Sequence, residues 1–422
     1  MKSLQGTLSS NFHLSIILLV AFVDYMGIGL VYPLFASLLF DRNMHILPPE
    51  TSDIMRGVWL GLLTAVMPIV QFFSAPILGT LSDQKGRKAI LLLSLGLGIL
   101  SYVVAIFGVG YGSLMMIFLY RVIAGVSSGS TAVVQAALAD VSTKEDKAKN
   151  FGLFNMALGV GFTIGPFLGG KLSDPGFLNI GGYSLPFWFS LAVVSINFVL
   201  ALVFLGETSS KQDRERVSLI SGLQNLRKAV FMKGFRVLIL CSFIFAFGWS
   251  FFFEFAPVLL IAKYEFNSAQ IGNFYAYSGA LYALSSGLLI RPIIQNFSPK
   301  TTLLLSLFLA GTCLLLFSNI DNSTYLYLCL PFLLFFIALI FPTISAMVSN
   351  SATRKMQGEM LGILQSAQSV AFGISPLFSG TFVGVYPMLP IILGGVSMII
   401  AGTVFGCYVF RRYLLPFVSL RD

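Results

Sequence analysis

The chain has 422 residues, of which 56% are hydrophobic and only 10% are charged. Soluble globular domains carry about 25% charged residues, so this composition excludes an ordinary soluble domain and indicates a protein with many membrane spans. We assign the formal net charge of +9 to basic residues in loops rather than to nucleic-acid binding.

Apolar runs of about 20 residues can cross the ~30 Å hydrocarbon core of a bilayer. The chain contains twelve such runs: 13–40, 57–82, 88–108, 113–139, 148–173, 184–206, 235–262, 268–292, 299–318, 324–350, 357–382 and 386–410. None has the alternating pattern of a membrane-barrel strand, so we expect an all-α membrane protein.

One long polar connection, 207–234, divides the predicted spans six and six. Within it, apolar residues at helical spacing from Val217 to Val230 predict an amphipathic helix at the membrane surface. We therefore expect an N-terminal six-helix bundle over 1–206, a cytoplasmic linker over 207–234 and a C-terminal six-helix bundle over 235–422.

The distribution of Lys and Arg predicts the orientation, because cytoplasmic loops are enriched in both. With the N-terminus inside, 21 of the 26 Lys and Arg residues fall in cytoplasmic segments. The outer segments hold four: Arg42, Arg56, Lys171 and Lys263. We expect both termini in the cytoplasm and a monomer in the inner (cytoplasmic) membrane of a bacterium.

The two halves of the chain contain similar stretches. Gly152–Gly170 and Gly362–Gly380 share 7 of 19 residues at an offset of 210, including Pro166 and Pro376. This similarity predicts duplicated six-span halves, and paired halves place a substrate site near the membrane midplane.

The first predicted span contains a carboxylate, Asp24, followed by Gly27, Gly29 and Pro33. A charge at the centre of a bilayer costs about 2.5–3.5 kcal/mol on insertion scales, so such an acid is a candidate functional site. The alternative is a structural contact between Asp24 and a neighbouring helix.

Arg121 and Glu254 are further charged residues that lie well inside predicted spans. At about 1.5 Å per residue, Arg121 lies about 12 Å and Asp24 about 13 Å from the outer side. We therefore expect Arg121 to be the partner of Asp24 in proton coupling, with a purely structural arginine as the alternative. Glu254 is nearer the outer end of its span, as either a second proton or cation site or an interfacial carboxylate.

The loop after the second span reads Gly79-Thr-Leu-Ser-Asp-Gln-Lys-Gly-Arg-Lys88. Gly86 permits a tight reversal, and Asp83 lies four residues before Arg87, within reach of an ion pair. A merely basic inner loop would not need this spacing. The stretch resembles the inner-loop signature of the major facilitator superfamily, G-x-x-x-D-x-x-G-R-K.

Three other stretches are similar to the same superfamily. Arg121, with a glycine four residues later, resembles its fourth-span signature. The stretch around Gly161 resembles the fifth-span motif of its antiporter branches, g-x(8)-G-P-x-x-G-G, matched at Gly165, Pro166, Gly169 and Gly170. Met156 stands where that motif begins with glycine. The stretch from Asp24 to Pro33 resembles the first span of tetracycline/proton antiporters.

This resemblance implies two pseudo-symmetric six-helix bundles and drug:proton antiport by alternating access. It implies that Asp24 carries the proton and that Asp83, Arg87 and Asp140 form a latch on the inner side, within the motif that includes Gly79, Gly86 and Lys88. Expected partners are protons, the lipid bilayer and a small amphipathic, drug-like substrate, with no nucleic acid. The proton gradient supplies the energy, so we expect no cofactor.

No metal site is expected, because the four cysteines lie in apolar runs and the two histidines are far from any cysteine pair. No G-x(4)-G-K-[ST] loop occurs, so we expect neither an ATP-driven pump nor an enzyme. Polar and aromatic residues within spans are candidates for binding substrate, with interhelical hydrogen bonds or packing as the alternative. These candidates are Tyr32, Gln135, Asn155, Phe247, Trp249, Tyr275, Gln365 and Gln368.

Two other functions stay open. One is a proton-coupled importer or exporter of a nutrient, metabolite or siderophore. The other is a non-transporting membrane receptor or lipid-handling protein, for which a substantial soluble domain would be the expected mark.

Overall fold

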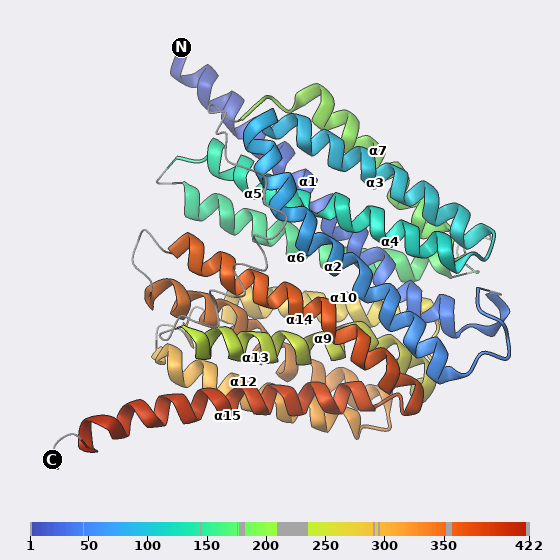
Figure 1. The fold of residues 1–422 in the computed structure, drawn as a ribbon, viewed down its shortest axis with the longest axis vertical. Helices are drawn as coiled ribbons and strands as arrows, with labels where there is room; N and C mark the ends of the chain where they lie inside the picture. The colour runs from blue at the N-terminus through green and yellow to red at the C-terminus, as the bar shows by residue number, and fades with distance from the viewer. Residues whose placement is uncertain are drawn as a thin grey trace. The chain divides into compact units, whose positions relative to one another are not determined.

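The computed structural model describes residues 2–44, 46–143, 146–174, 176, 182–208, 235–289, 292–293, 296–351 and 357–418. The described residues form helices and contain no strand (Figure 1). The predicted amphipathic helix in the linker lies outside the described residues. The all-α class predicted from composition and periodicity is confirmed.

The first half of the chain contains α1 (Lys2–Phe40), η1 (Arg42–Met44), α2 (Asp53–Lys85), α3 (Arg87–Gly110), α4 (Leu114–Ser128), α5 (Ser130–Val141), α6 (Lys147–Ser173) and α7 (Leu185–Phe204). The second half contains α9 (Arg236–Tyr264), α10 (Ser268–Leu284), the π-helix η2 (Ser285–Leu289), α12 (Pro299–Ser318), α13 (Ser323–Ser351), α14 (Gln357–Val385) and α15 (Leu389–Val418).

Eleven helical segments within the described residues are long and apolar enough to cross a membrane. They coincide with eleven of the predicted spans, and α10 followed by η2 occupies the remaining one, 268–292. The structure changes the assignment of one basic residue that the sequence placed in an outer segment. Arg56 lies in the first turn of α2, not in an outer loop, and its side chain is buried, with 1% exposed.

The chain forms two compact units. Unit 1 comprises residues 1–51, 66–221 and 266–279, and unit 2 comprises 52–65, 222–265 and 280–422. The start of α2 therefore belongs to unit 2 and the start of α10 to unit 1. The predicted bundle boundaries at 206 and 235 stay a prediction, because the linker between them is largely outside the described residues.

Each unit includes a close glycine contact made by one of these shared helices. In unit 1, Gly170 of α6 packs against the backbone of α10 at Gly272, and in unit 2, Gly380 of α14 packs against α2 at Gly61. Small residues let membrane helices approach closely. Gly170 and Gly380 are equivalent positions of the internal repeat, so the repeat has a structural counterpart.

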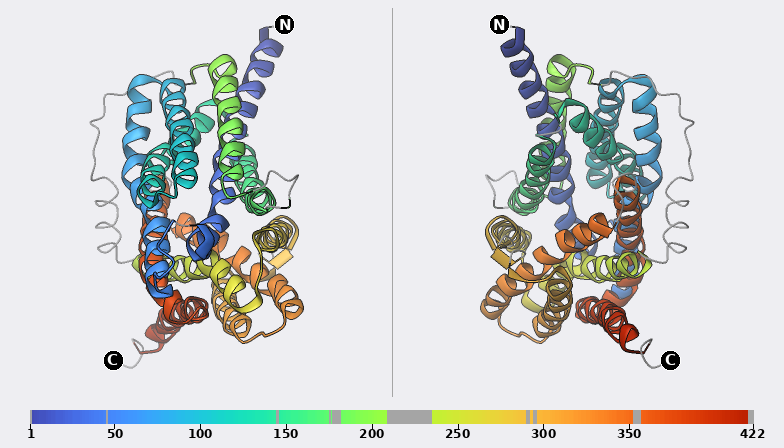
Figure 2. Two further views of the ribbon diagram at one scale, coloured as in Figure 1. Left: turned by 90° about the vertical axis from the view of Figure 1, so that its right-hand side faces the viewer. Right: turned by 90° about the vertical axis from the view of Figure 1, so that its left-hand side faces the viewer.

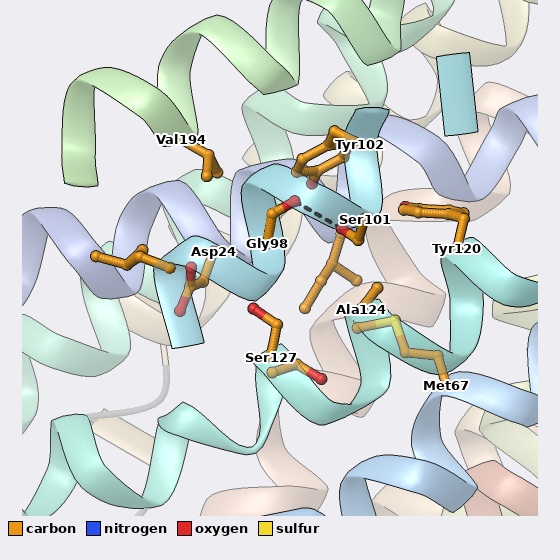
Figure 3. A pocket seen from close by; sticks show the side chains of 12 residues that line it. Asp24, Met67, Gly98, Ser101, Tyr102, Tyr120, Ala124, Ser127 and Val194 are labelled. Atoms are coloured by element: carbon orange, nitrogen blue, oxygen red, sulfur yellow. Dashed lines mark hydrogen bonds between the residues drawn. The ribbon is translucent and has the colours of Figure 1, made fainter. Parts of the chain in front are cut away.

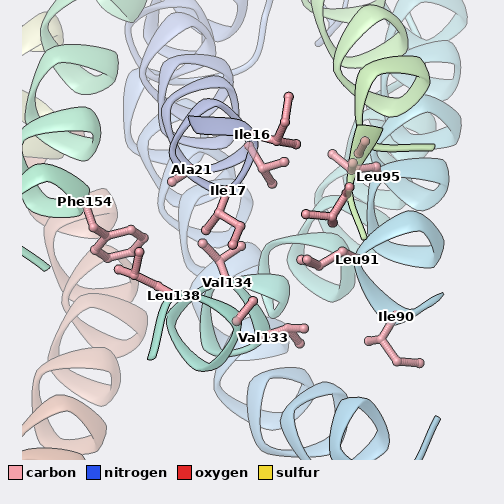
Figure 4. Close-up of a cluster of buried hydrophobic side chains, with 14 of the residues drawn as sticks. Ile16, Ile17, Ala21, Ile90, Leu91, Leu95, Val133, Val134, Leu138 and Phe154 are labelled. Carbon is pink, nitrogen blue, oxygen red and sulfur yellow. The ribbon is translucent and has the colours of Figure 1, made fainter. Parts of the chain in front are cut away.

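Helix α1 is central to unit 1, where it packs against α5, α6 and α7 (Figure 2). A cluster of buried hydrophobic side chains joins α1 to α3 and α5, with Ile17, Leu91 and Leu138 among its members (Figure 4). This apolar cluster fixes the part of α1 that precedes Asp24.

The fourth predicted span is interrupted at Gly129, which separates α4 from α5. A side chain at Gly129 would collide with Ser74 of α2. Two α2 side chains bind carbonyls beside the interruption: Gln71 donates to the Ser128 carbonyl at 3.1 Å, and Ser74 donates to the Gly125 carbonyl at 3.0 Å. These bonds stabilise an interruption that would otherwise leave polar backbone groups unpaired in the membrane.

Candidate functional site

Asp24 lies in the middle of α1 and accepts a hydrogen bond from the Ser130 hydroxyl at 3.3 Å. Ser130 is the first residue of α5. The interruption of the fourth span therefore gives the carboxylate a hydroxyl donor from the first residue of α5.

A cavity of about 40 Å³ adjoins Asp24 (Figure 3). Its walls come from α1, α2, α3, α4 and α7, all within unit 1. Figure 3 shows Asp24, Ser127 and Tyr102 around this space. The hydroxyl-bearing residues of the lining are Ser101, Tyr102, Tyr120, Ser127 and Ser128.

The serine hydroxyls of the cavity are oriented by the backbone. Ser101 donates to the Gly98 carbonyl at 2.7 Å, and Ser127 donates to the Ser94 carbonyl at 2.8 Å. Ser128 donates to the carbonyl of the helical residue three positions before it, at 3.2 Å. Each serine proton is thus engaged, and the serine oxygens keep lone pairs that can accept further hydrogen bonds.

The expected pairing of Asp24 with Arg121 does not occur among the described residues. Arg121 is buried, with 1% exposed. Its Nη1 lies 3.1 Å from the sulfur of Met67, and its guanidinium carbon lies 5.0 Å from the centre of the Phe35 ring. Phe35 is eleven residues beyond Asp24, about 16 Å along α1.

The long arginine side chain thus reaches a different level of α1 from the one its backbone position indicates. Equal backbone depth was not sufficient to predict the contact. The part of Arg121 in proton coupling stays a prediction.

The inner-loop motif brings three charged side chains together. The Arg87 guanidinium lies 2.6 Å from a carboxylate oxygen of Asp83 and 3.0 Å from one of Asp140. Its remaining terminal nitrogen donates to Ser82 at 2.6 Å. The latch role that the resemblance implied for this cluster stays a prediction.

Glu207 joins this motif, and the sequence reasoning missed it. Its carboxylate accepts hydrogen bonds from the backbone N–H groups of Arg87 at 2.8 Å and Lys88 at 3.3 Å, at the start of α3. Gly86 has φ 94° and a side chain there would meet Glu207. The signal in the sequence was a carboxylate directly after the sixth span. Elsewhere in the motif, Gly79 lies in α2.

The antiporter-type motif in α6 forms a glycine face against α1. Side chains at Gly161, Gly165 and Gly169 would collide with α1 backbone atoms. Their spacing of four residues places them on one side of α6. On the same helix, Pro166 lies against Gly29 of α1. The motif therefore positions the helix that carries Asp24.

Glu254 is buried in α9, with 3% exposed, and accepts a hydrogen bond from Ser250 at 2.8 Å. It lies in unit 2, whereas the Asp24 cavity is in unit 1. Burial argues against the interfacial alternative for Glu254. Its role in proton coupling stays a prediction.

The structure places the substrate candidates in different surroundings. Gln135, Asn155 and Gln365 are exposed. Tyr275 is buried, and Gln368 donates to Ser242 at 2.8 Å. Within unit 2, Phe247 packs against the ring of Phe251 and Trp249 against that of Phe252. The Tyr32 side chain is outside what the structure describes.

The serines beside Asp24 were not among the candidates. The short run Ser127-Ser128-Gly129-Ser130 interrupts an otherwise apolar span. Small polar residues in the middle of a span were the available signal. In the described part of the chain, no group of three His, Cys, Asp or Glu side chains is arranged to hold a metal ion.

The sequence matches the family described as Major Facilitator Superfamily over residues 17–376 and 238–416. The chain belongs to the major facilitator superfamily. It is an integral membrane protein of a family of transporters, which bind small-molecule substrates within the membrane.

Several characterised relatives are resistance proteins. The chain is 29% identical to the class H tetracycline resistance protein of Pasteurella multocida over 378 residues, covering 87% of this chain and 88% of that protein. It is 29% identical to the class C protein of Escherichia coli, covering 88% and 89%. It is 28% identical to the quinolone resistance protein NorA of Staphylococcus aureus, with the same coverage.

Solved structures show the same fold at low sequence identity. The human organic anion transporter MFSD10 matches with a TM-score of 0.69 and 21% identity, covering 94% of this chain and 99% of that one. A bacterial homologue of the lysosomal transporter Spinster matches with a TM-score of 0.74 and 13% identity, covering 93% and 95%. The major facilitator fold predicted from the inner-loop motif is confirmed.

Proposed function

We propose that this transporter exports a small amphipathic, drug-like compound in exchange for protons, and that Asp24 carries the coupled proton. The observation that carries this proposal is the Asp24 carboxylate in mid-span, which accepts a hydrogen bond from a hydroxyl and adjoins a polar cavity. Relatives named for tetracycline and quinolone resistance support an amphipathic substrate.

The chemistry follows from what each protonation state of Asp24 prefers. The ionised carboxylate is stabilised by the hydrogen bond that the Ser130 hydroxyl donates. The neutral acid loses most of that stabilisation, but its desolvation in an apolar environment costs less free energy than that of the ionised form. Protonation therefore changes the free energy of the contact between α1 and α5. Such a difference between states is what a coupling ion needs in order to drive a conformational change.

Reconstituted protein in liposomes with an imposed pH gradient tests this proposal, with a tetracycline and a quinolone as probes. We expect movement of probe against the proton flow, and at least a tenfold loss of gradient-driven movement in Asp24→Asn. Probe exchange without a gradient should continue, because the neutral amide mimics the protonated acid.

The control is Asp321→Asn, which alters an acid whose side chain is 94% exposed. It should transport like the wild type. Undiminished proton-driven transport by Asp24→Asn would overturn the assignment of the proton to Asp24. Movement of substrate in the same direction as protons would instead favour the importer.

A further inference from the structure

We propose that the cavity beside Asp24 is a hydrated chamber in which the Tyr102 hydroxyl passes the transported proton to and from the Asp24 carboxylate. This inference rests on the proposed function, since it assigns the path by which the coupled proton reaches its site. It adds a binding site for water and a relay residue to that function.

The volume of the cavity fits a small water cluster. A buried water needs about 10–15 Å³ of such volume and two to four polar partners. The cavity of about 40 Å³ therefore has room for roughly three water molecules. Asp24 and five hydroxyl-bearing residues line it, so each water can find the partners that it needs.

The polarity of the lining favours a proton over an anion. The hydroxyl protons of Ser101, Ser127 and Ser128 are directed at backbone carbonyls, so their oxygens face further partners as acceptors. The carboxylate of Asp24 is an acceptor as well. A chamber rich in acceptors stabilises water molecules that carry an extra proton and disfavours chloride or hydroxide.

Tyr102 is close to the helix that carries Asp24. A side chain at Gly27 would collide with the Tyr102 hydroxyl, so this hydroxyl lies directly against α1 at that residue. Gly27 follows Asp24 by three residues and is therefore its neighbour on the helix surface. Tyr102 and Asp24 also line the same cavity.

A phenol can donate and accept a hydrogen bond at the same time. In the proposed step, a water between Tyr102 and Asp24 passes a proton to the carboxylate and takes the phenolic proton. The phenol oxygen accepts the extra proton of a protonated water on its other side, which is left as neutral water. One O–H bond forms for each that breaks, and Tyr102 ends unchanged. One proton has then moved along the chamber.

Asn197 indicates how far the polar region extends. Its side chain is buried, with 1% exposed, and neither its oxygen nor its nitrogen has a hydrogen-bond partner among the described residues. Val194, which lines the cavity, precedes it by three residues, so both lie on one face of α7. Buried amides in native proteins are hydrogen-bonded to protein or water. The chamber water thus extends toward Asn197.

The test combines transport with a spectroscopic measurement on Tyr102→Phe, which keeps the ring and removes only the hydroxyl. We expect gradient-driven transport to fall about tenfold and its pH profile to shift, while the affinity for a tetracycline probe without a gradient changes less than twofold. In infrared difference spectra of purified protein, the carboxyl band of Asp24, identified by its loss in Asp24→Asn, should shift in Tyr102→Phe.

A matched serine pair on α3 provides a second measurement. Ser101→Ala removes a hydroxyl that lines the cavity, and we expect it to alter the same band and slow transport. Ser94→Ala removes a buried hydroxyl that is also bonded to its own helix, at 2.9 Å from the Ile90 carbonyl, and does not line the cavity. It should behave as the wild type.

Three results would overturn the relay. One is a Tyr102→Phe protein with wild-type transport, pH profile and carboxyl band. Another is a carboxyl band that responds to sodium and not to pH, which would make the chamber a sodium site. The third is an equal loss of gradient-driven transport in Ser94→Ala and Ser101→Ala.

The infrared band is read without any transport. Proton-driven transport that persists in Asp24→Asn would therefore refute the proposed function separately, while a shifted band in Tyr102→Phe would still support the hydrated chamber.

Discussion

At the scale of single residues, the site depends on how a carboxylate is kept in a membrane span. The sequence suggested an opposite charge as the partner of Asp24, and the structure provides the hydroxyl of Ser130, the first residue of α5, instead. Arg121 contacts Met67 and Phe35. A carboxylate held by a neutral donor can lose and gain a proton without breaking an ion pair.

Replacing Ser130 should change the pH dependence of transport. Ser130→Ala removes the hydrogen bond to the ionised carboxylate, and hydrogen bonds to charged groups contribute about 1.5–3 kcal/mol. The protonated form becomes relatively more favourable, so the pH of half-maximal transport should rise by about one to two units. Transport rates measured across a pH series check this shift.

Ser130→Thr keeps a hydroxyl at the same position and serves as the control for Ser130→Ala. It should retain the wild-type profile. Identical pH profiles for Ser130→Ala and the wild type would show that this hydrogen bond does not affect the coupled proton.

At the scale of helices, the antiporter-type motif acts through backbone contact. Gly161, Gly165 and Gly169 lie against α1, and α1 carries Asp24. In membranes, such close packing gives much of the association free energy between helices. The motif thus holds α1 close to α6. A larger residue at any of these three glycines would push α1 away from α6.

The same helix offers a matched pair of glycines for testing this packing. Gly165→Ala places a methyl group against the α1 backbone at Met26 and Leu30, and overpacking of this kind costs roughly 1–3 kcal/mol. Gly159→Ala meets no atom within 4 Å, so the better helix propensity of alanine should leave stability equal or higher. Thermal unfolding of the purified variants compares them, and equal melting temperatures would contradict the packing role.

Much of this arrangement could be predicted, because long apolar runs and a spaced loop motif carry their information locally. The all-α class and the approach of Asp83 to Arg87 follow from such patterns. The pairing of Asp24 could not be predicted, because backbone depth does not fix where a long arginine side chain ends. Glu207 and Ser130 were missed since their contacts depend on how distant helices pack.

At the scale of the whole molecule, the division into units crosses two helices. The boundary in α2 lies between Ala65 and Val66, and Pro68 follows within one turn. Proline has no N–H and removes a helical hydrogen bond. Near it, Thr64 donates to the carbonyls of Leu60 and Gly61 at 2.9 and 3.1 Å. Helix α2 therefore lacks a backbone hydrogen bond close to where it passes from one unit to the other.

Restoring the missing hydrogen bond should stiffen α2 at this point. We expect Pro68→Ala to transport several-fold more slowly at unchanged substrate affinity, with thermal stability equal to or above that of the wild type. Transport rates and probe binding on the same preparation measure the two effects. An unchanged rate would show that bending at Pro68 is not part of the cycle.

The shared helices also affect how the protein is made. Gly57 and Gly61 of α2 are synthesised more than 300 residues before Gly380 of α14, against which they pack. The start of α2 must therefore remain in the membrane without its glycine partner until α14 has been inserted. Folding of unit 2 is thus completed only after α14 has been synthesised.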